Sequence, residues 1–237
     1  MKERLQKILS RAGYGSRRVC EKIISSNRIK VNGEIAELGS KADEAEDDIS
    51  IDGHHLLFKP LKHIYIAFNK PDGILSEIYS SPREKTVRDY IPLPDYIFIV
   101  GRLDKDSEGL ILLTNDGDLA NQLTHPRYEH EKEYQVLVQR EPDEKQLSAL
   151  RKGIVLQSGQ KTAPAKISIY KKSNAGAWLK VILHEGRKRQ IREMGAIIGL
   201  PVLRIIRTRI GQLKLNDLKP GMWRKLSEEE IVNIKSR

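Results

Sequence analysis

The chain has 237 residues, 39% of them hydrophobic and 31% charged, and a formal net charge of +10. That length allows two domains, and the composition is typical of a folded soluble protein rather than of a disordered one. The longest apolar runs, 96–100 and 110–113, are far shorter than the roughly 18–20 residues of a membrane span, and the N-terminus lacks the apolar core of a secretory signal. The single cysteine, Cys20, excludes an internal disulfide framework, so we expect a cytoplasmic protein.

The positive charge is concentrated in two blocks. Residues 1–33 carry nine Lys and Arg against two Glu, and residues 179–214 again carry nine against two. Between 34 and 60 the balance reverses, with two Lys against eight acidic residues. Two separate basic blocks favour two surfaces that bind a polyanion such as nucleic acid, although solvated basic faces would give the same count. Aromatic residues make up only 5%, so a membrane surface fits less well.

The first 60 residues indicate a small module. Apolar residues recur at helical spacing over 3–12 and over 17–25, where Val19 belongs to the apolar face, and Ser16 is placed to cap the second helix. A strand over 28–31 leads into Asn-Gly, the strongest short signal for a hairpin turn, and a second short strand is expected over 48–52. Three basic side chains of the second helix are left facing outward as candidates for nucleic-acid contact: Arg17, Arg18 and Lys22.

A linker is expected at 59–63, and the pattern then changes to strands with a few helices. We predict strands over 64–69, 96–100, 110–114, 134–139, 166–170, 178–184 and 202–213. We predict helices over 118–123, 143–150 and from Lys188 to about Ile198. Hairpin-length connections with few helices favour an α+β domain with a largely antiparallel sheet rather than a doubly wound one.

The segment from Gly101 to Gly117 contains the most informative polar residues. Arg102 and Asp104 lie on a loop between two apolar strands, where reactive groups are commonly placed, and in an extended loop they point the same way. An ordinary acidic turn explains Asp104 to Gly109 equally well on these grounds alone. Asp116-Gly-Asp118 indicates a turn and a helix cap rather than a metal site.

A second group of candidates lies near the C-terminus. On the predicted helix, Lys188 and Arg192 are one turn apart and share a face. With arginines of the following strand they would form a basic wall along a nucleic-acid backbone, unless this is merely a solvated basic helix. The wall comprises Lys188, Arg192, Arg204, Arg207 and Arg209, and Arg189 is a further candidate for nucleic-acid contact. The six histidines and the single cysteine show no metal-ligand spacing.

The loop segment also resembles a known family. Residues 101–115, Gly-Arg-Leu-Asp-Lys-Asp-Ser-Glu-Gly-Leu-Ile-Leu-Leu-Thr-Asn, are similar at every fixed position to the signature of the RsuA/RluB-type pseudouridine synthases. Three further blocks resemble family blocks in the same order, namely 69–76, 131–136 and 185–194. The N-terminal module resembles the RNA-binding domain first described in the small-subunit ribosomal protein S-four. The similarity runs from Arg4 to Leu226 and is closest to the RluB branch.

The resemblance implies roles for individual residues. Asp104 would be the family's essential aspartate, Tyr134 the aromatic residue that packs on the target base, and Arg192 the basic partner of the aspartate. Arg187 and Arg189 lie close enough to compete for that last role. Arg102 would help to hold the RNA with the base turned out. Taken alone, Tyr134 would more often be a half-buried strand tyrosine.

The reaction that the resemblance implies agrees with these residue types. Uracil is detached from ribose at N1, rotated and rejoined through C5, so nothing is oxidised or added and no cofactor or metal is expected. An ionised carboxylate would either attack C1′ or remove a ribose proton. An arginine beside it would keep it charged in a site that excludes water, and a tyrosine suits a flipped pyrimidine.

We therefore expect an RNA-binding domain at 1–60 and a catalytic domain at 64–237, acting as a monomer on ribosomal RNA, most simply that of the large subunit. Asp106 is expected to be a replaceable surface turn residue. The alternatives are a small-subunit specificity, a non-catalytic ribosome assembly factor and a metal-dependent nuclease. A nuclease would use Asp104, Asp106, Asp116 and Asp118.

Overall fold

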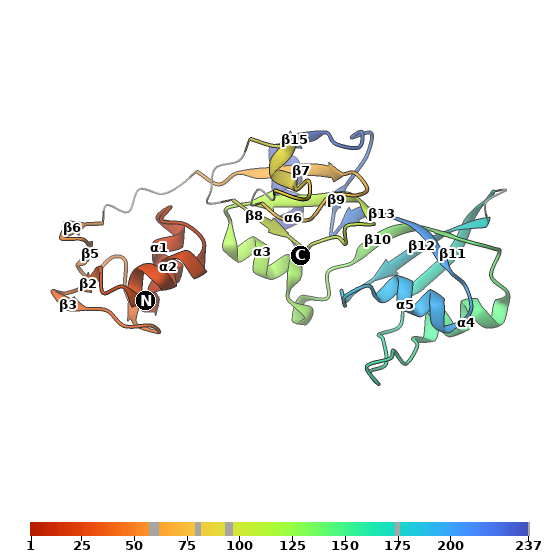
Figure 1. Ribbon diagram of the computed structural model, residues 1–237, viewed down its shortest axis with the longest axis horizontal. Coiled ribbons are helices and arrows are strands. Elements are labelled where there is room, and N and C mark those ends of the chain that lie inside the picture. Colours follow the sequence, from red (N-terminus) through yellow and green to blue (C-terminus); the bar gives the residue numbers. More distant parts are fainter. Residues whose placement is uncertain (57–61, 79–81, 93–96, 174–175, 237) are drawn as a thin grey trace. The chain divides into compact units, whose positions relative to one another are not determined.

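The computed structural model describes residues 1–236 apart from 57–61, 79–81, 93–96 and 174–175 (Figure 1). The chain divides into two compact units, one formed by 1–64 with 93–98 and the other by 65–92 with 99–237. Most of the expected linker, 59–63, and the start of the strand expected at 96–100 lie outside the described residues. No helix in the described part of the chain is both long and apolar enough to cross a membrane.

The N-terminal unit packs two helices against short strands. In chain order its elements are β1 (Glu3–Arg4), α1 (Leu5–Arg11), α2 (Arg17–Ser25), β2 (Ile29–Val31), β3 (Glu34–Ile35), β4 (Lys41–Ala42), β5 (Ile49–Ile51) and β6 (His54–His55). The strands pair in the order β3-β2-β5-β6, and β1 pairs with β4. The turn between β2 and β3 has positive φ at both Asn32 and Gly33, which is the backbone that the Asn-Gly pair favours.

The apolar periodicity of the two helices accounts for this unit's core. Leu5, Ile8 and Leu9 of α1 are fully buried, and they pack with Cys20 and Ile24 of α2. The Ser16 hydroxyl accepts a hydrogen bond from the Val19 amide and caps α2 as expected. The prediction that Val19 faces the core was wrong, since its side chain is exposed and Cys20 takes the buried position.

The second unit is built on one large sheet. Its strands are β7 (Tyr65–Lys70), β8 (Phe98–Val100), β9 (Glu108–Thr114), β10 (Lys132–Val138), β11 (Lys166–Ser173), β12 (Gly176–Leu183), β13 (Val202–Ile210), β14 (Leu213–Lys214) and β15 (Trp223–Lys225). Its helices are α3 (Gly117–Thr124), α4 (Glu144–Lys152), α5 (Gln190–Ile197) and α6 (Glu228–Lys235), with 3₁₀ turns at Val87–Asp89 and Pro126–Tyr128.

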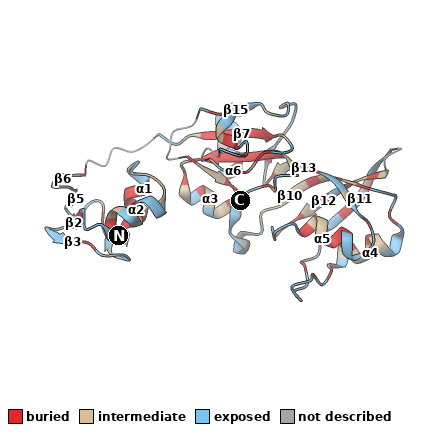
Figure 2. Ribbon diagram, viewed as in Figure 1, coloured by how far each residue is buried: buried red, intermediate tan, exposed pale blue. Residues whose placement is uncertain are grey.

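The strand order in this sheet is β11-β12-β10-β13-β9-β7-β15, with β8 on β9 and β14 on β13. Along that order the neighbouring strands run antiparallel, except that β13 and β9 run parallel. The largely antiparallel α+β fold expected from the sequence is therefore confirmed. Every residue of β7 is buried (Figure 2), as is every residue of β9 after Glu108. There Leu110 and Leu112 pack with Leu119 of α3 and Ile234 of α6.

The parallel pairing of β9 with β13 requires a glycine. Gly109 has φ +105°, and a Cβ added there would lie 2.3 Å from the backbone oxygen of Arg207. No side chain fits at that distance, so the glycine lets the two strands approach. This gives a physical reason for one fixed position of the 101–115 signature, and it places the loop before β9 beside β13.

Candidate active site

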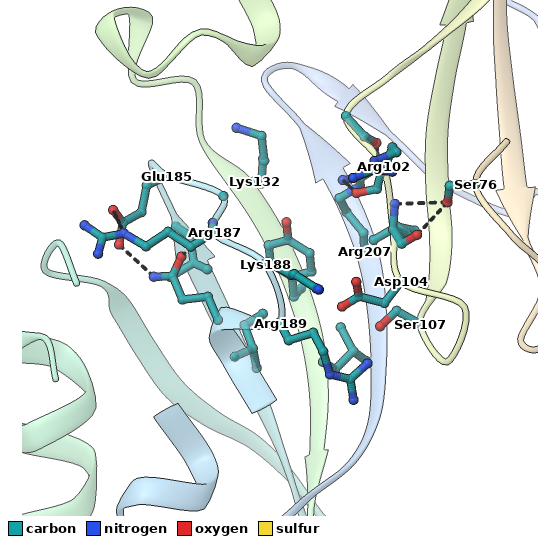
Figure 3. A pocket seen from close by; sticks show the side chains of 18 of the residues that line it. Ser76, Arg102, Asp104, Ser107, Lys132, Glu185, Arg187, Lys188, Arg189 and Arg207 are labelled. Carbon is teal, nitrogen blue, oxygen red and sulfur yellow. Dashed lines mark hydrogen bonds and ion pairs between the residues drawn. The ribbon is translucent and has the colours of Figure 1, made fainter. Parts of the chain in front are cut away.

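A cleft of about 610 Å³ opens on one face of the large sheet (Figure 3). Its walls come from the loop before β9, from β10, and from the segment that joins β12 to α5. The structure brings most of the predicted site residues together there, namely Arg102, Asp104, Tyr134, Lys188, Arg189 and Arg207. Arg192 and Arg204 are absent from the lining among the described residues.

The loop that carries Asp104 is held by hydrogen bonds from several directions. The Ser76 hydroxyl accepts from the Leu103 amide at 3.1 Å and donates to the Leu103 carbonyl oxygen at 2.6 Å. The Ser107 amide donates to the Asp104 carbonyl oxygen at 3.1 Å. This loop is therefore more than an ordinary acidic turn, because the residue next to Asp104 is anchored at both backbone atoms.

A buried lysine fixes the far end of the same loop. Lys70 ends β7 fully buried, and its Nζ donates to the carbonyl oxygens of Pro71, Lys105 and Ser107 at 3.0, 3.0 and 2.7 Å. Burial lowers the pKa of Lys70 to about 8. A charged donor is costly to bury unless it is hydrogen-bonded, so the three backbone contacts of Lys70 indicate that it holds this loop in place. Lys70 was not singled out from the sequence.

Arg207 of β13 holds the start of the Asp104 loop. Its side chain is buried, with Nη2 donating to the Gly101 oxygen and Nε to the Leu110 oxygen, both at 2.7 Å. Burial lowers the pKa of Arg207, while its electrostatic interaction with the neighbouring Tyr134 side chain opposes that shift. The prediction that Arg207 belongs to a basic wall along nucleic acid was wrong, because its donors are engaged by backbone oxygens in the sheet.

A β-bulge explains why Arg207 faces the cleft while Arg209 does not. Residues two apart on a regular strand share a face. On β13, however, Glu133 is paired with Arg209 and the next residue of β10, Tyr134, with Arg207, so Thr208 is an extra residue. The Thr208 hydroxyl donates to the Glu133 side chain at 3.0 Å. The bulge therefore directs one arginine to Tyr134 and the other to the reverse face.

Two arginines converge on Asp106 rather than on Asp104. Arg189 donates to both carboxylate oxygens of Asp106 at 3.0 Å, and Arg192 lies 3.2 Å from one of them. Arg192 also donates to the Asp106 backbone oxygen at 2.5 Å. The hydrogen bonds from Arg189 lower the pKa of the Asp106 carboxyl. Asp106 lies exposed in a turn, as expected, but two arginines engage it, and Arg192 pairs with Asp106 where Asp104 had been expected.

The Asp104 carboxylate itself lies at the cleft wall without a charged partner. Within the described ranges, no hydrogen bond or ion pair to its side chain is found, although it is half-buried. Asp104 does add to the raised pKa of Arg189, after the larger contribution of the Asp106 hydrogen bonds. The aspartate therefore lies in a positive field while both of its oxygens stay available to a bound molecule.

Helix α5 begins later than expected. It starts at Gln190, and Arg189 before it has a left-handed backbone with φ 52°. Lys188 is consequently not helical, and the predicted shared helical face of Lys188 and Arg192 was wrong. The left-handed residue turns the chain so that Lys188 and Arg189 point into the cleft (Figure 3).

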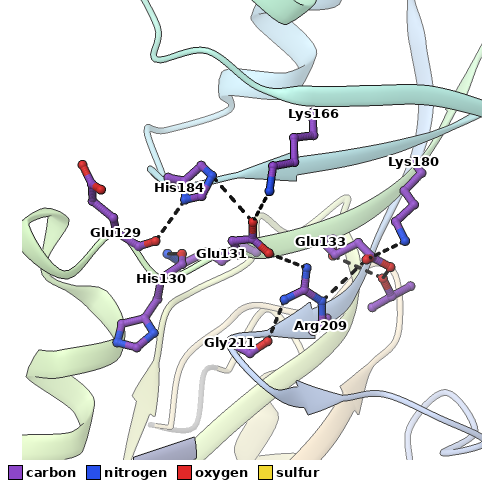
Figure 4. A network of polar contacts seen from close by, with 11 residues as sticks. Glu129, His130, Glu131, Glu133, Lys166, Lys180, His184, Arg209 and Gly211 are labelled. Atoms are coloured by element: carbon purple, nitrogen blue, oxygen red, sulfur yellow. Dashed lines mark hydrogen bonds and ion pairs between the residues drawn. The ribbon is translucent and has the colours of Figure 1, made fainter. Parts of the chain in front are cut away.

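The reverse face of β10 and β13 carries paired charges (Figure 4). Glu131 lies 2.8 Å from Lys166 and 2.9 Å from Arg209, and Glu133 lies 3.0 Å from Lys180. These five residues are called the reverse-face network below. Arg204 also lies on this face, where it donates to both Glu108 oxygens at 2.5 and 2.7 Å. The prediction that Arg204 shares a wall with Lys188 was therefore wrong.

Asp116, another aspartate of the nuclease alternative, has a structural role. Asp116 caps α3 by accepting from the Leu119 amide at 3.0 Å, as expected, and it also accepts from the Tyr65 hydroxyl at 2.7 Å. Across the described residues, no group of three or more His, Cys, Asp or Glu side chains is arranged to hold a metal ion. In the N-terminal unit, Arg17, Arg18 and Lys22 are exposed on α2.

Comparison with known proteins identifies the family. Residues 64–196 match the family model described as RNA pseudouridylate synthase, and residues 3–49 match the S4 domain. The chain belongs to the RNA pseudouridylate synthase family. The loop of Asp104 and the cleft around it lie within the matched segment or directly beside it in the sheet. The activity of this family, isomerisation of uridine in RNA to pseudouridine, is therefore the activity of this protein.

Individual relatives agree over nearly the full length. The chain is 40% identical over 99% of its length, and 94% of the relative's, to an uncharacterized RNA pseudouridine synthase of Aquifex aeolicus. It is 38% identical over 99%, and 96% of the relative's length, to the ribosomal large subunit pseudouridine synthase B of Bacillus subtilis. A crystal structure of a pseudouridylate synthase matches with a TM-score of 0.69 and 30% identity, covering 98% of this chain and 99% of that one.

Proposed function

We propose that this pseudouridine synthase isomerises one specific uridine of large-subunit ribosomal RNA, working in the cytoplasm as a monomer without a metal or cofactor. The names of its relatives support the choice of RNA, since the Bacillus subtilis enzyme and a Pasteurella multocida enzyme, 41% identical over 98% of this chain, are both named for the large subunit. The reaction is redox-neutral and adds no atom, which supports the absence of a cofactor.

The observation that carries this proposal is that the backbone around Asp104 is held in place while its carboxylate is not engaged. Its loop is held rigidly by Ser76, Lys70 and Arg207, while its carboxylate is left available in the cleft. A positioned, ionised carboxylate is what the reaction requires, whether it attacks ribose C1′ or removes a ribose proton. A carboxylate that served only stability would instead be engaged, as those of Asp106 and Asp116 are.

Other cleft residues have complementary roles in this proposal. Tyr134, beside Arg207, stacks on the flipped uracil, and Arg102 helps to hold the RNA with the base turned out. Lys188 and Arg189 contact the backbone of the bound strand. Arg192 acts indirectly, because it holds Asp106 and so keeps Arg189 beside the aspartate loop.

The N-terminal and C-terminal parts of the chain have different functions in this proposal. We assign RNA binding to a domain of residues 1–60, with contacts from Arg17, Arg18 and Lys22, and catalysis to residues 64–237. The exposure of the three basic side chains on α2 supports this division. Removal of residues 1–60 should reduce the slope of log affinity against log salt by roughly 0.7–0.9 for each phosphate that these residues neutralise.

Release of tritium from ribosomal RNA labelled at uridine C5 tests the proposal, because C5 loses its hydrogen when it becomes the glycosidic carbon. The purified chain should release tritium from large-subunit RNA, and it should do so in excess chelator whenever the RNA remains folded. Binding without release would favour an assembly factor. Cleavage of the RNA would favour a nuclease, and release from small-subunit RNA alone would change the assigned substrate.

A further inference from the structure

The cleft contains a second unpaired charge, which the proposed roles leave unused. Lys132 is the first residue of β10 and lies two residues before Tyr134, on the same face of the strand. Figure 3 shows its side chain among those lining the cleft. Both neighbouring strands pair with it, through Leu183 of β12 and Ile210 of β13, so its backbone is fixed from two sides.

The ammonium group of Lys132 lacks charge compensation. Its hydrogen-bond partner is the backbone oxygen of His130 at 3.3 Å, and over the described segments it forms no ion pair with a carboxylate. Burial, and then the neighbouring Arg207 guanidinium, lower the pKa of Lys132. A half-buried cation beside another cation is unfavourable unless an anion joins them.

The two acidic residues beside Lys132 in sequence do not supply that anion. Glu131 and Glu133 belong to the reverse-face network, where they are engaged by Arg209, Lys166 and Lys180. The alternation of β10 thus places its carboxylates on one face and its lysine on the other. No carboxylate of the described residues pairs with the positive charge that Lys132 brings to the cleft.

We propose that Lys132 binds a phosphate of the substrate RNA that adjoins the target uridine. This inference rests on the proposed function. Two residues of a strand span about 6.6 Å, so the backbone of Lys132 lies about the length of one ribose from the backbone of Tyr134, on whose ring uracil would stack. A flipped nucleotide brings its own phosphate to the edge of the pocket that holds its base. An ammonium ion there compensates the phosphate and holds the nucleotide in the flipped state.

The test combines protein and RNA changes. Short RNAs carrying the target uridine are made with one neutral methylphosphonate, placed at a different linkage near the uridine in each RNA. Each of these RNAs has a 2′-deoxy residue before the modified linkage. Its reference RNA has the same 2′-deoxy residue but an ordinary phosphate at that linkage. At one linkage next to the uridine, the wild-type protein should bind about tenfold more weakly. K132Q should bind the reference about tenfold more weakly and be insensitive to that methylphosphonate, whereas K132R should keep the wild-type pattern.

The control is K145Q, which removes an exposed lysine of α4 outside the cleft and should behave as wild type. Affinity measured against salt gives a second readout, in which K132Q flattens the log–log slope by about 0.7. The inference is overturned if K132Q loses as much affinity as wild type at every methylphosphonate, or if its slope is unchanged. Failure of the proposed function is separate, since the wild-type protein would then form no pseudouridine in the unmodified RNA.

Discussion

The two faces of β10 and β13 differ in whether their charged side chains are paired. On the reverse face, Glu131 and Glu133 are matched by lysines and an arginine within ion-pair distance. On the cleft face, Asp104 and Lys132 have no charged partner within the described residues. The two strands therefore separate a stabilising set of charges on one face from uncompensated charges in the cleft on the other.

The pairing of charges therefore distinguishes the functional face of the sheet from the structural one. Charges that are mutually satisfied can be removed at a cost in stability alone. Charges that are held in place but unsatisfied have a cost in the free protein, which is offset only when a ligand binds. Substitutions on the cleft face should therefore change turnover and RNA affinity, whereas substitutions in the reverse-face network should change stability.

The largest effect is expected at the centre of the cleft. Asp104→Asn should reduce turnover by at least about a thousandfold, because an amide can neither attack C1′ nor accept a proton as an anion does. Its melting temperature and RNA affinity should stay near wild type, since the Asp104 side chain contributes no ion pair to the described fold. Tritium release measures turnover, and Asp217→Asn, an exposed surface change, is the matched control.

Lys70→Met should lower the free energy of unfolding by about 2–4 kcal/mol, because three carbonyl oxygens lose a charged donor in a buried site. The variant should also lose activity, since the Asp104 loop is no longer held. Urea denaturation at pH 7 gives the stability difference. A decrease below about 1 kcal/mol would show that the loop holds its position without Lys70.

The pH dependence of that difference provides a second check. Because the pKa of Lys70 is about 8 in the fold against 10.5 when unperturbed, the unfolded chain binds the extra proton between these values. The contribution of Lys70 to stability therefore increases as pH rises through this window, by about 3 kcal/mol at most. Wild type and Lys70→Met should diverge in stability from pH 8 upward, and parallel curves would contradict the buried, charged lysine.

Asp106→Asn should reduce turnover by about tenfold to a hundredfold with little change in stability. The substitution weakens the contacts that hold Arg189 and Arg192 beside the aspartate loop, and these side chains are partly exposed. Turnover under single-turnover conditions separates this effect from RNA binding. An activity within threefold of wild type would mean that the arginine pair does not affect Asp104.

The smallest effect is expected in the reverse-face network. Hydrogen bonds from Lys166 and Arg209 lower the pKa of Glu131 to about 2, from 4.5. Its stabilising contribution is present above pH 4.5 and is lost as pH falls toward 2, and solvent exposure limits it to about 1 kcal/mol. Glu131→Gln should therefore be less stable at pH 6 by that amount and equal to wild type near pH 2, by denaturant titration at both values, with turnover at pH 7 nearly unchanged.

Local signals in the sequence predicted much of this molecule. The Asn32-Gly33 turn and the caps at Ser16 and Asp116 depend on neighbouring residues alone, and the structure confirms them. The signature at 101–115 located the loop of Asp104. Helix α6 was missed although Ser227 and Glu230 form a capping box, a signal that was available in the sequence.

Features that depend on distant pairing could not be predicted in the same way. The bulge at Thr208 arises from the register between β10 and β13, so the sequence alone placed Arg207 and Arg209 on one face. The left-handed backbone of Arg189 has no local signal, because glycine and asparagine are the residues that favour it. The burial of Lys70 could have been suspected, since it directly follows an apolar strand pattern.

The central claim is that this chain forms pseudouridine in large-subunit ribosomal RNA through Asp104. Mapping pseudouridines in ribosomal RNA from a strain that lacks the chain tests it most directly. We predict that one large-subunit position is unmodified, that the wild-type chain restores it, and that Asp104→Asn, expressed at equal level, does not. An unchanged pseudouridine map in the deletion strain, or full restoration by Asp104→Asn, would contradict the claim.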